Sequence, residues 1–150
     1  MSMNVEDART QMVNQQVRAW DVLDPAVLSV LAQVPREQFV PPRFRNLAFA
    51  DTEIPLGAGQ VMMTPQVEGR LLQALAIRGT DRVLEVGTGS GFLTACLARL
   101  GSGVTSLEIL PELADAARRN LRGVATWNAE VRIEDVFQYR PGELYDVIAV

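Results

Sequence analysis

Glycines stand at alternate positions, Gly87, Gly89 and Gly91, directly after a run of apolar and acidic residues at 83–86 that is typical of a buried strand. An apolar helical pattern follows over residues 92–100. Because glycine lacks a Cβ, it adopts positive φ readily and lets a ligand lie against the backbone, where free N–H groups at a helix start face it. The sequence therefore predicts a strand, a tight turn and a helix that together hold a small molecule.

The spacing of these glycines distinguishes between classes of ligand. The dinucleotide pattern G-x-G-x-x-G requires glycine at position 92, where this chain has Phe92. The observed pattern E-x-G-x-G-x-G, which begins at Glu85, resembles the first motif of Rossmann-like methyltransferases that bind S-adenosylmethionine. That resemblance implies cofactor contacts from Glu85, Gly87, Thr88, Gly89, Ser90 and Gly91. A glycine turn of this kind can also be purely structural.

Two further carboxylates follow predicted strands. Glu108 lies near the end of a strand expected at residues 104–109, about twenty residues past the glycines, where a carboxylate can accept both ribose hydroxyls. This feature indicates a nucleoside without identifying it. Asp135 follows the alternating residues 131–133, and in methyltransferases an acid at the end of the third strand lies near the adenine. Alone, Asp135 would be interpreted as an ordinary loop acid.

The composition excludes several kinds of catalysis. The 150 residues suffice for one domain with a substantial core. The chain has no histidine, and all 14 of its cationic residues are arginines. A histidine general base, a Ser-His-Asp triad, a lysine Schiff base, a Walker lysine and a histidine metal site are therefore excluded. The single cysteine, Cys96, is expected to be a buried apolar residue, and no metal site is expected.

Charge and hydropathy suggest where the protein works. A net charge of −4 without a basic cluster argues against nonspecific binding to nucleic acid, although Arg36, Arg43 and Arg45 suit either a local positive patch or a solvated face. No apolar run approaches the length of about eighteen residues that spans a bilayer, and the N-terminus lacks the features of a secretory signal. We expect a cytoplasmic protein that binds neither nucleic acid nor a membrane.

Residues 1–63 are expected to form an N-terminal helical extension on the substrate side of a single domain. Apolar positions at helical spacing predict a helix over residues 5–20. Asp24 and Pro25 supply an N-cap and a first-turn proline for a second helix, which ends near Val34.

Residues 64–150 are expected to form the cofactor-binding part, and the loop-like residues 54–59 precede it. Thr64 and Pro65 begin a helix that Gly79 is placed to end. Strands and helices then alternate, which predicts an α/β fold with a parallel sheet. Right-handed crossovers give the strand order 3-2-1-4, with the ligand at the switch point.

The last predicted strand, residues 145–150, ends the sequence with an apolar edge uncovered. A complete sheet of this methyltransferase type has further strands. We therefore expect the sequence to be the N-terminal part of a longer protein, and the exposed last strand to favour self-association.

The chain resembles protein-L-isoaspartate O-methyltransferases over nearly its whole length. The segments that carry the resemblance are residues 12–17 (MVNQQV), 34–41 (VPREQFVP), 48–51 (AFAD), 55–60 (PLGAGQ) and 83–91 (VLEVGTGSG). The resemblance implies S-adenosyl-L-methionine as the cofactor and, as the partner, a damaged peptide or protein whose isoaspartyl carboxylate receives the methyl group. That carboxylate has a reference pKa near ~4 and needs no general base, which suits a chain without histidine or lysine.

The chain departs from the family next to the chemistry. After Gln60 the family continues with Thr-Ile-Ser, one further residue and a proline, so the serine near the reacting carboxylate is replaced by Met63. A thioether cannot donate a hydrogen bond. Thr64 is a second candidate for contact with the substrate, but as an N-cap its hydroxyl would serve the helix. Met62 and Met63 would then pack over the cofactor or line a pocket for a more apolar substrate.

Two alternative functions stay open on this sequence. One is a relative that methylates a different carboxylate or a small molecule, which the substitutions Val61 and Met63 favour. The other is a cofactor-binding module without catalysis.

Overall fold

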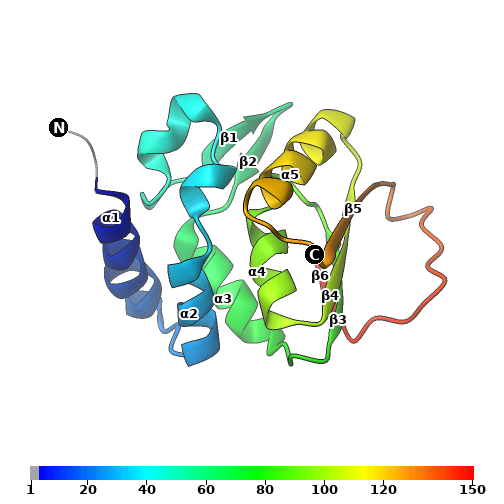
Figure 1. Cartoon of the computed structure of the whole chain (residues 1–150), viewed down its shortest axis with the longest axis horizontal. Coiled ribbons are helices and arrows are strands. Elements are labelled where there is room, and N and C mark those ends of the chain that lie inside the picture. The colour runs from blue at the N-terminus through cyan, green and yellow to red at the C-terminus, as the bar shows by residue number, and fades with distance from the viewer. Residues whose placement is uncertain (1–3) are drawn as a thin grey trace. The chain divides into compact units, whose positions relative to one another are not determined.

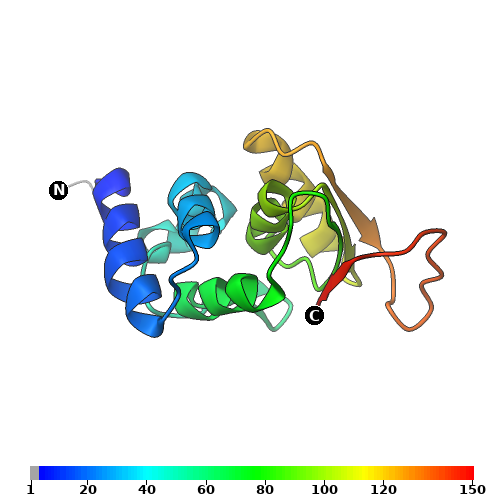
Figure 2. The ribbon, with the colours of Figure 1, turned by 90° about the horizontal axis from the view of Figure 1, so that it is seen from below.

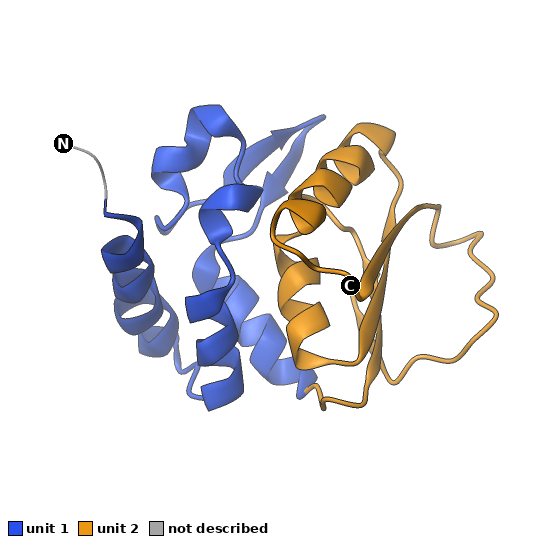
Figure 3. Cartoon of the chain, viewed as in Figure 1, with its two compact units in different colours: residues 1–76 blue, residues 77–150 orange. Residues whose placement is uncertain are grey.

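A computed structural model describes residues 4–150, and the chain forms two compact units, residues 1–76 and 77–150 (Figure 3). The first unit is mostly helical. Its regular elements are α1 (Val5–Gln11), a π-helical segment (Met12–Val17), a 3-10 turn (Arg18–Trp20), α2 (Pro25–Gln33), two further 3-10 segments (Arg36–Phe39 and Pro42–Leu47), β1 (Ile54–Gly57), β2 (Gln60–Met62) and α3 (Pro65–Leu75).

The predicted helices of the first unit are confirmed, with one change of type. The helix expected over residues 5–20 keeps its extent, but its hydrogen bonds change from α to π at Met12 and to 3-10 at Arg18. The side chain of Asp24 accepts from the Ala26 N–H at 2.9 Å and caps α2 as expected.

Residues 54–59 were wrongly expected to be a loop, because β1 and β2 form an antiparallel hairpin there. Ile54 and Met62 are paired, and both are buried. The turn between the strands uses positive φ at three consecutive residues, Gly57, Ala58 and Gly59. Pairing across this turn buries two apolar side chains, which is sufficient reason for two very short strands to form.

The helix α3 also ends earlier than expected. It stops at Ala76, which takes a left-handed conformation with φ 49° and donates to the carbonyl of Gln73, and not at Gly79. Gly69 lies against the first unit's core, since a Cβ at this position would come within 2.8 Å of Val17. The helix α3 therefore packs within the first unit. The sequence-based division after residue 63 instead groups α3 with the cofactor-binding part.

The second unit is a four-stranded sheet in the order β5-β4-β3-β6, and every pair of neighbouring strands is parallel. The predicted α/β class and the strand order 3-2-1-4 are confirmed. The elements are β3 (Arg82–Val86), α4 (Phe92–Leu100), β4 (Gly103–Glu108), α5 (Pro111–Gly123), β5 (Ala129–Ile133) and β6 (Val147–Ala149). Both α4 and α5 lie on one side of the sheet, and the connection over residues 134–146 lies on the other (Figures 1 and 2).

Within the second unit α4 is almost entirely buried, since each of its residues from Phe92 to Ala98 is buried. Cys96 lies in this helix with none of its surface exposed, so the buried apolar role predicted for it is confirmed. Among residues 4–150, none of the helices has the length and apolar character needed to cross a membrane. The same described residues contain no cluster of three or more acidic, cysteine or histidine side chains arranged for a metal ion.

Candidate cofactor site

The glycine turn between β3 and α4 has the backbone conformation that its sequence predicts. Gly87, Gly89 and Gly91 have φ of 93°, 57° and 90°, in the left-handed region where other residues are strained. A Cβ added at Gly87 would meet nothing within 4 Å, so the backbone there borders open space. A Cβ at Gly91 would lie 3.3 Å from the Cβ of Ala117. The first glycine therefore leaves room for a ligand, and the last permits α4 and α5 to pack closely.

The register of the sheet brings the predicted acidic residues to the same edge as the turn. Val86, the last residue of β3, pairs with Leu107, and Glu108 pairs with Ile133. The turn, Glu108 and the segment leading to Asp135 thus leave the carboxyl ends of three adjacent parallel strands. Ligands bind at this edge in open parallel sheets.

Glu108 is bonded directly to the glycine turn. One of its carboxylate oxygens accepts from the Gly89 N–H at 2.9 Å, and the other accepts from the Leu110 N–H at 3.2 Å. The side chain is only 6% exposed, so these two bonds fix its orientation. A carboxylate has about four acceptor positions, which leaves capacity for the hydroxyls of a ribose.

Glu85 points into the protein and not toward the open side of the turn. It is buried, and one carboxylate oxygen accepts from the hydroxyls of Thr94 and of Ser106, the latter at 2.6 Å. Ser106 also contacts the Thr88 hydroxyl at 2.6 Å. Because the single hydroxyl proton of Ser106 is donated to Glu85, Thr88 is the donor in its contact with Ser106. The network joins β3, α4 and β4 beneath the turn.

The remaining polar residues of the turn are also turned inward. Ser90 is buried, its hydroxyl accepts from the Phe92 N–H at 3.3 Å, and its carbonyl accepts from the Asn120 amide at 3.0 Å. Thr88 is buried as well. Contacts from residues 87–91 to a ligand would therefore come chiefly from the backbone.

Asp135 caps the start of the segment that follows β5. Its side chain accepts from the Phe137 N–H at 2.9 Å, and its carbonyl accepts from the N–H groups of Gln138 and Tyr139 at 3.0 Å. The residue is half-buried, and one oxygen of its carboxylate takes part in none of these bonds. Asp135 is thus both the loop acid and a candidate acceptor for an adenine amino group.

Met63 and Thr64, the candidates for contact with the substrate that accepts the methyl group, lie in the first unit between β2 and α3. Thr64 caps α3, with its hydroxyl 3.5 Å from the Val67 N–H, as the sequence predicts. Accepting this bond leaves the hydroxyl proton of Thr64 able to donate. Met63 is half-buried, while Met62 is packed into the core of this unit. Met62 therefore serves the hairpin, and only Met63 keeps a partly exposed side chain.

Sequence reasoning missed three supporting residues and misjudged a fourth. Thr94 and Ser106 bind Glu85, and the buried carboxylate of Glu68 in α3 accepts from Arg36. None of the three belongs to a motif, and their only signal is a polar residue inside an otherwise apolar or helical pattern. Arg36 was expected on a positive patch or a solvated face, and both interpretations are wrong because the side chain is fully buried. Burial of an arginine is decided by a distant partner, which local pattern does not reveal.

The family model and the curated relatives identify one family. The family model described as Protein-L-isoaspartate(D-aspartate) O-methyltransferase matches residues 7–150. A protein-L-isoaspartate O-methyltransferase 1 of Rhodopseudomonas palustris (strain HaA2) is 42% identical over 143 residues, which cover 95% of this chain and 58% of that relative. A protein-L-isoaspartate O-methyltransferase of Methanoculleus marisnigri is 41% identical, with 95% of this chain and 65% of the relative covered. The chain thus spans less than two thirds of the length of these curated relatives.

Solved structures show the same fold. One protein-L-isoaspartate O-methyltransferase structure superposes with a TM-score of 0.79 at 22% identity, over 94% of this chain and 47% of that chain. A structure described as a putative protein-L-isoaspartate O-methyltransferase from Plasmodium falciparum, in complex with S-adenosyl-L-homocysteine, also gives 0.79 at 20% identity, over 98% and 72%. The predicted methyltransferase-type fold is confirmed.

Proposed function

The chain belongs to the protein-L-isoaspartate(D-aspartate) O-methyltransferase family, and we propose for it the transfer of a methyl group from S-adenosyl-L-methionine to the isoaspartyl carboxylate of a damaged protein. The observation that carries the proposal is the turn of three positive-φ glycines held by Glu108 at the carboxyl edge of the sheet. Protein repair is the role that follows from this chemistry.

The residues present fit the proposed cofactor. The open backbone at Gly87 gives room for the ligand, Glu108 offers acceptors for ribose hydroxyls, and Asp135 offers one for the adenine amino group. The buried network from Glu85 through Ser106 to Thr88 holds the turn in place and is proposed to act beneath the ligand. When bound, the cofactor supplies an electrophilic methyl group on a sulfonium centre.

The acceptor chemistry suits a chain without histidine or lysine. An isoaspartyl carboxylate, with a reference pKa near ~4, arrives ionised at neutral pH, so no residue of the chain has to remove a proton. The remaining tasks are to orient the carboxylate toward the methyl group and to exclude water. Met63 and the free hydroxyl proton of Thr64 are proposed to meet the acceptor.

Incubation of the purified full-length protein with methyl-labelled cofactor and an isoaspartyl peptide tests this function. We expect a base-labile methyl ester on the isoaspartyl peptide and none on its aspartyl counterpart. Calorimetry with S-adenosyl-L-homocysteine measures cofactor binding separately. Binding without ester would refute the isoaspartyl substrate and leave the cofactor proposal standing, whereas absence of binding would refute both.

Methylation of another carboxylate or of a small molecule is the second candidate. It is favoured by the exposed Val61 and the half-buried Met63, which replace polar family residues in the acceptor loop. Binding without turnover on any acceptor would instead identify a non-catalytic module. The cytoplasm remains the proposed location, supported by the low cysteine content of the chain, whose single cysteine is buried. Association through the last strand remains a prediction that gel filtration tests.

A further inference from the structure

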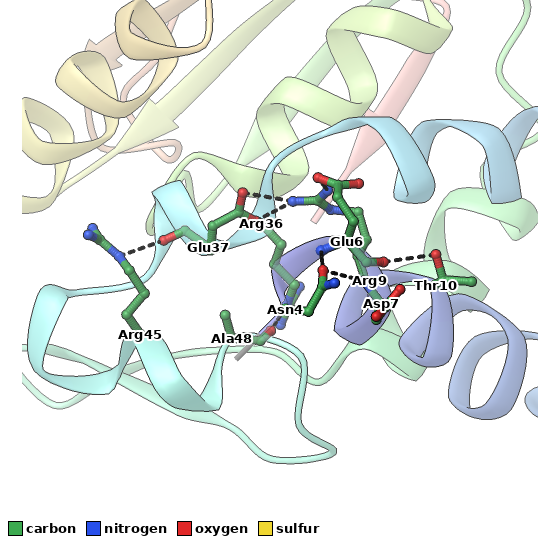
Figure 4. Close-up of polar contacts among 9 residues, drawn as sticks. All are labelled: Asn4, Glu6, Asp7, Arg9, Thr10, Arg36, Glu37, Arg45 and Ala48. Atoms are coloured by element: carbon green, nitrogen blue, oxygen red, sulfur yellow. Dashed lines mark hydrogen bonds and ion pairs between the residues drawn. The ribbon is translucent and has the colours of Figure 1, made fainter. Parts of the chain in front are cut away.

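Arg36 connects three separate segments of the first unit through one fully buried guanidinium. Its Nε donates to the carbonyl of Ala48 at 2.7 Å, and its Nη2 donates to the carbonyl of Met63 at 2.9 Å. Its Nη1 donates to the carboxylate of Glu68, which is also buried. Figure 4 shows Arg36 and Ala48 among the polar contacts of this unit.

The geometry of these bonds depends on the arginine side chain. A guanidinium is a rigid planar fork whose donors point in fixed directions, so it can hold three acceptors in one arrangement. A lysine ammonium is a compact charge on a flexible stem and cannot reproduce that arrangement. Glu68 compensates the positive charge within a region closed to water, and charges are rarely buried without such a partner.

One of the two carbonyls that Arg36 binds is that of Met63, where the chain departs from its family. Met63 occupies the position of the family serine, and Thr64, next in sequence, caps α3. Glu68 lies one helical turn beyond Thr64 on the same helix. Arg36 therefore holds the Met63–Thr64 segment, called the acceptor segment below, from both sides. It binds Met63 directly, and through Glu68 it binds the first turns of α3.

We propose that Arg36 is a positioning residue that holds the Met63–Thr64 segment in the conformation required to receive the methyl acceptor. The inference rests on the proposed function, because it assigns Met63 and Thr64 to the acceptor side of the reaction. Because its side chain is fully buried, Arg36 is assigned no contact with the reacting atoms. It acts by restricting the conformations of the Met63–Thr64 segment, so the segment loses less conformational entropy when the methyl acceptor binds.

A second buried arginine in the same unit provides a matched control. Arg9 donates from Nη2 to both carboxylate oxygens of Glu37, at 2.6 and 2.7 Å, and is 5% exposed (Figure 4). It also pairs with Glu6. Like Arg36 it joins distant segments, but its bonds to Glu6 and Glu37 do not reach the acceptor segment at Met63 and Thr64. Loss of either arginine should weaken the unit, and only loss of Arg36 should release Met63.

The experiment compares Arg36→Lys with Arg9→Lys in the full-length protein. For Arg36→Lys we expect the KM for an isoaspartyl peptide to rise about tenfold, the effect of losing a hydrogen bond to a charged group, while the Kd of S-adenosyl-L-homocysteine stays unchanged. Amide hydrogen exchange over residues 59–64 should accelerate by a similar factor. Arg9→Lys should leave the KM and the exchange of this segment at the wild-type values.

Each outcome bears on a different claim. Suppose that the wild-type protein is active. An unchanged KM in Arg36→Lys, or equal changes of KM in Arg36→Lys and Arg9→Lys, would then overturn the positioning role. Wild-type protein that binds cofactor but forms no ester would overturn the proposed function, and the acceptor role of Arg36 with it. If Arg36→Lys does not fold, Glu68→Gln provides the second variant, because a neutral amide keeps an acceptor for the guanidinium but holds it more weakly, and it should raise the KM in the same direction.

Discussion

Glu108 joins the end of β4 to the glycine turn, since its carboxylate accepts from the Gly89 N–H, and we propose that its remaining acceptor positions bind the ribose hydroxyls. We predict that Glu108→Ala weakens the binding of S-adenosyl-L-homocysteine by about 1.5 to 3 kcal/mol, the contribution of hydrogen bonds to a charged group. Isothermal titration calorimetry measures the change. Glu112→Ala, which removes an exposed carboxylate at the start of α5, is the matched control and should bind as wild type does. Equal affinity of Glu108→Ala and wild type would show that another residue holds the ribose.

We predict that the side chain of Met63 determines which methyl acceptor the protein prefers. The Met63 carbonyl is held by Arg36, so Met63→Ser should change the side chain while the backbone stays in place. We predict that this substitution raises kcat/KM for an isoaspartyl peptide about tenfold, because a hydroxyl donor replaces a thioether beside the carboxylate. Val67→Thr adds a hydroxyl at an exposed position nearby and should have no effect. A fall in kcat/KM for Met63→Ser would indicate that the natural acceptor is more apolar.

At the scale of elements, the sequence predicts those helices, strands and turns that depend on residues close together in the chain. The β3–turn–α4 unit follows from an apolar run, alternate glycines and helical spacing, which all lie within residues 82–100. The β1–β2 hairpin was missed because its strands have four and three residues and contain Pro55 and Gly57, which weaken a strand pattern. The Arg36–Glu68 pair joins residues 32 positions apart, and no local feature of either residue predicts it.

The three glycines of the turn are predicted to differ in what they contribute. Gly87→Ala places a Cβ in open space, so it should cost about 1 to 2 kcal/mol of stability through its positive φ and should also obstruct the ligand. Gly91→Ala carries the same strain and adds a close contact with Ala117 in α5. Urea unfolding should therefore find Gly91→Ala less stable than Gly87→Ala. Calorimetry should find that Gly87→Ala loses more cofactor affinity than Gly91→Ala does, relative to the stability that each variant loses. A larger relative loss of affinity in Gly91→Ala would contradict a ligand at Gly87.

At the scale of the whole molecule, the buried charges of the first unit make stability depend on pH. Burial raises the pKa of Glu68 from 4.5 to about 7, and the adjacent Arg36 guanidinium offsets only part of this effect. The folded state thus binds the Glu68 proton more tightly than the unfolded state does. The resulting stabilisation is complete below a pH of about 4.5 and is lost as the pH rises through about 7.

We therefore predict that the free energy of unfolding falls by up to about 3 kcal/mol between pH about 4.5 and about 8 through Glu68 alone. Urea titrations of wild type and Glu68→Gln across this range isolate the effect, because an amide cannot ionise and the variant should lose this part of the pH dependence. Glu37→Gln, which alters the other buried arginine pair, is the control and should retain it. If Glu68→Gln follows wild type at every pH, Glu68 is ionised throughout and Arg36 compensates its burial fully. If the two curves converge below a pH of about 4.5 and separate as the pH rises to about 7, with wild type the less stable, the proton on Glu68 is the cause. In that case the carboxyl group that pairs with Arg36, and so supports the segment at Met63, titrates near pH 7 in the folded protein.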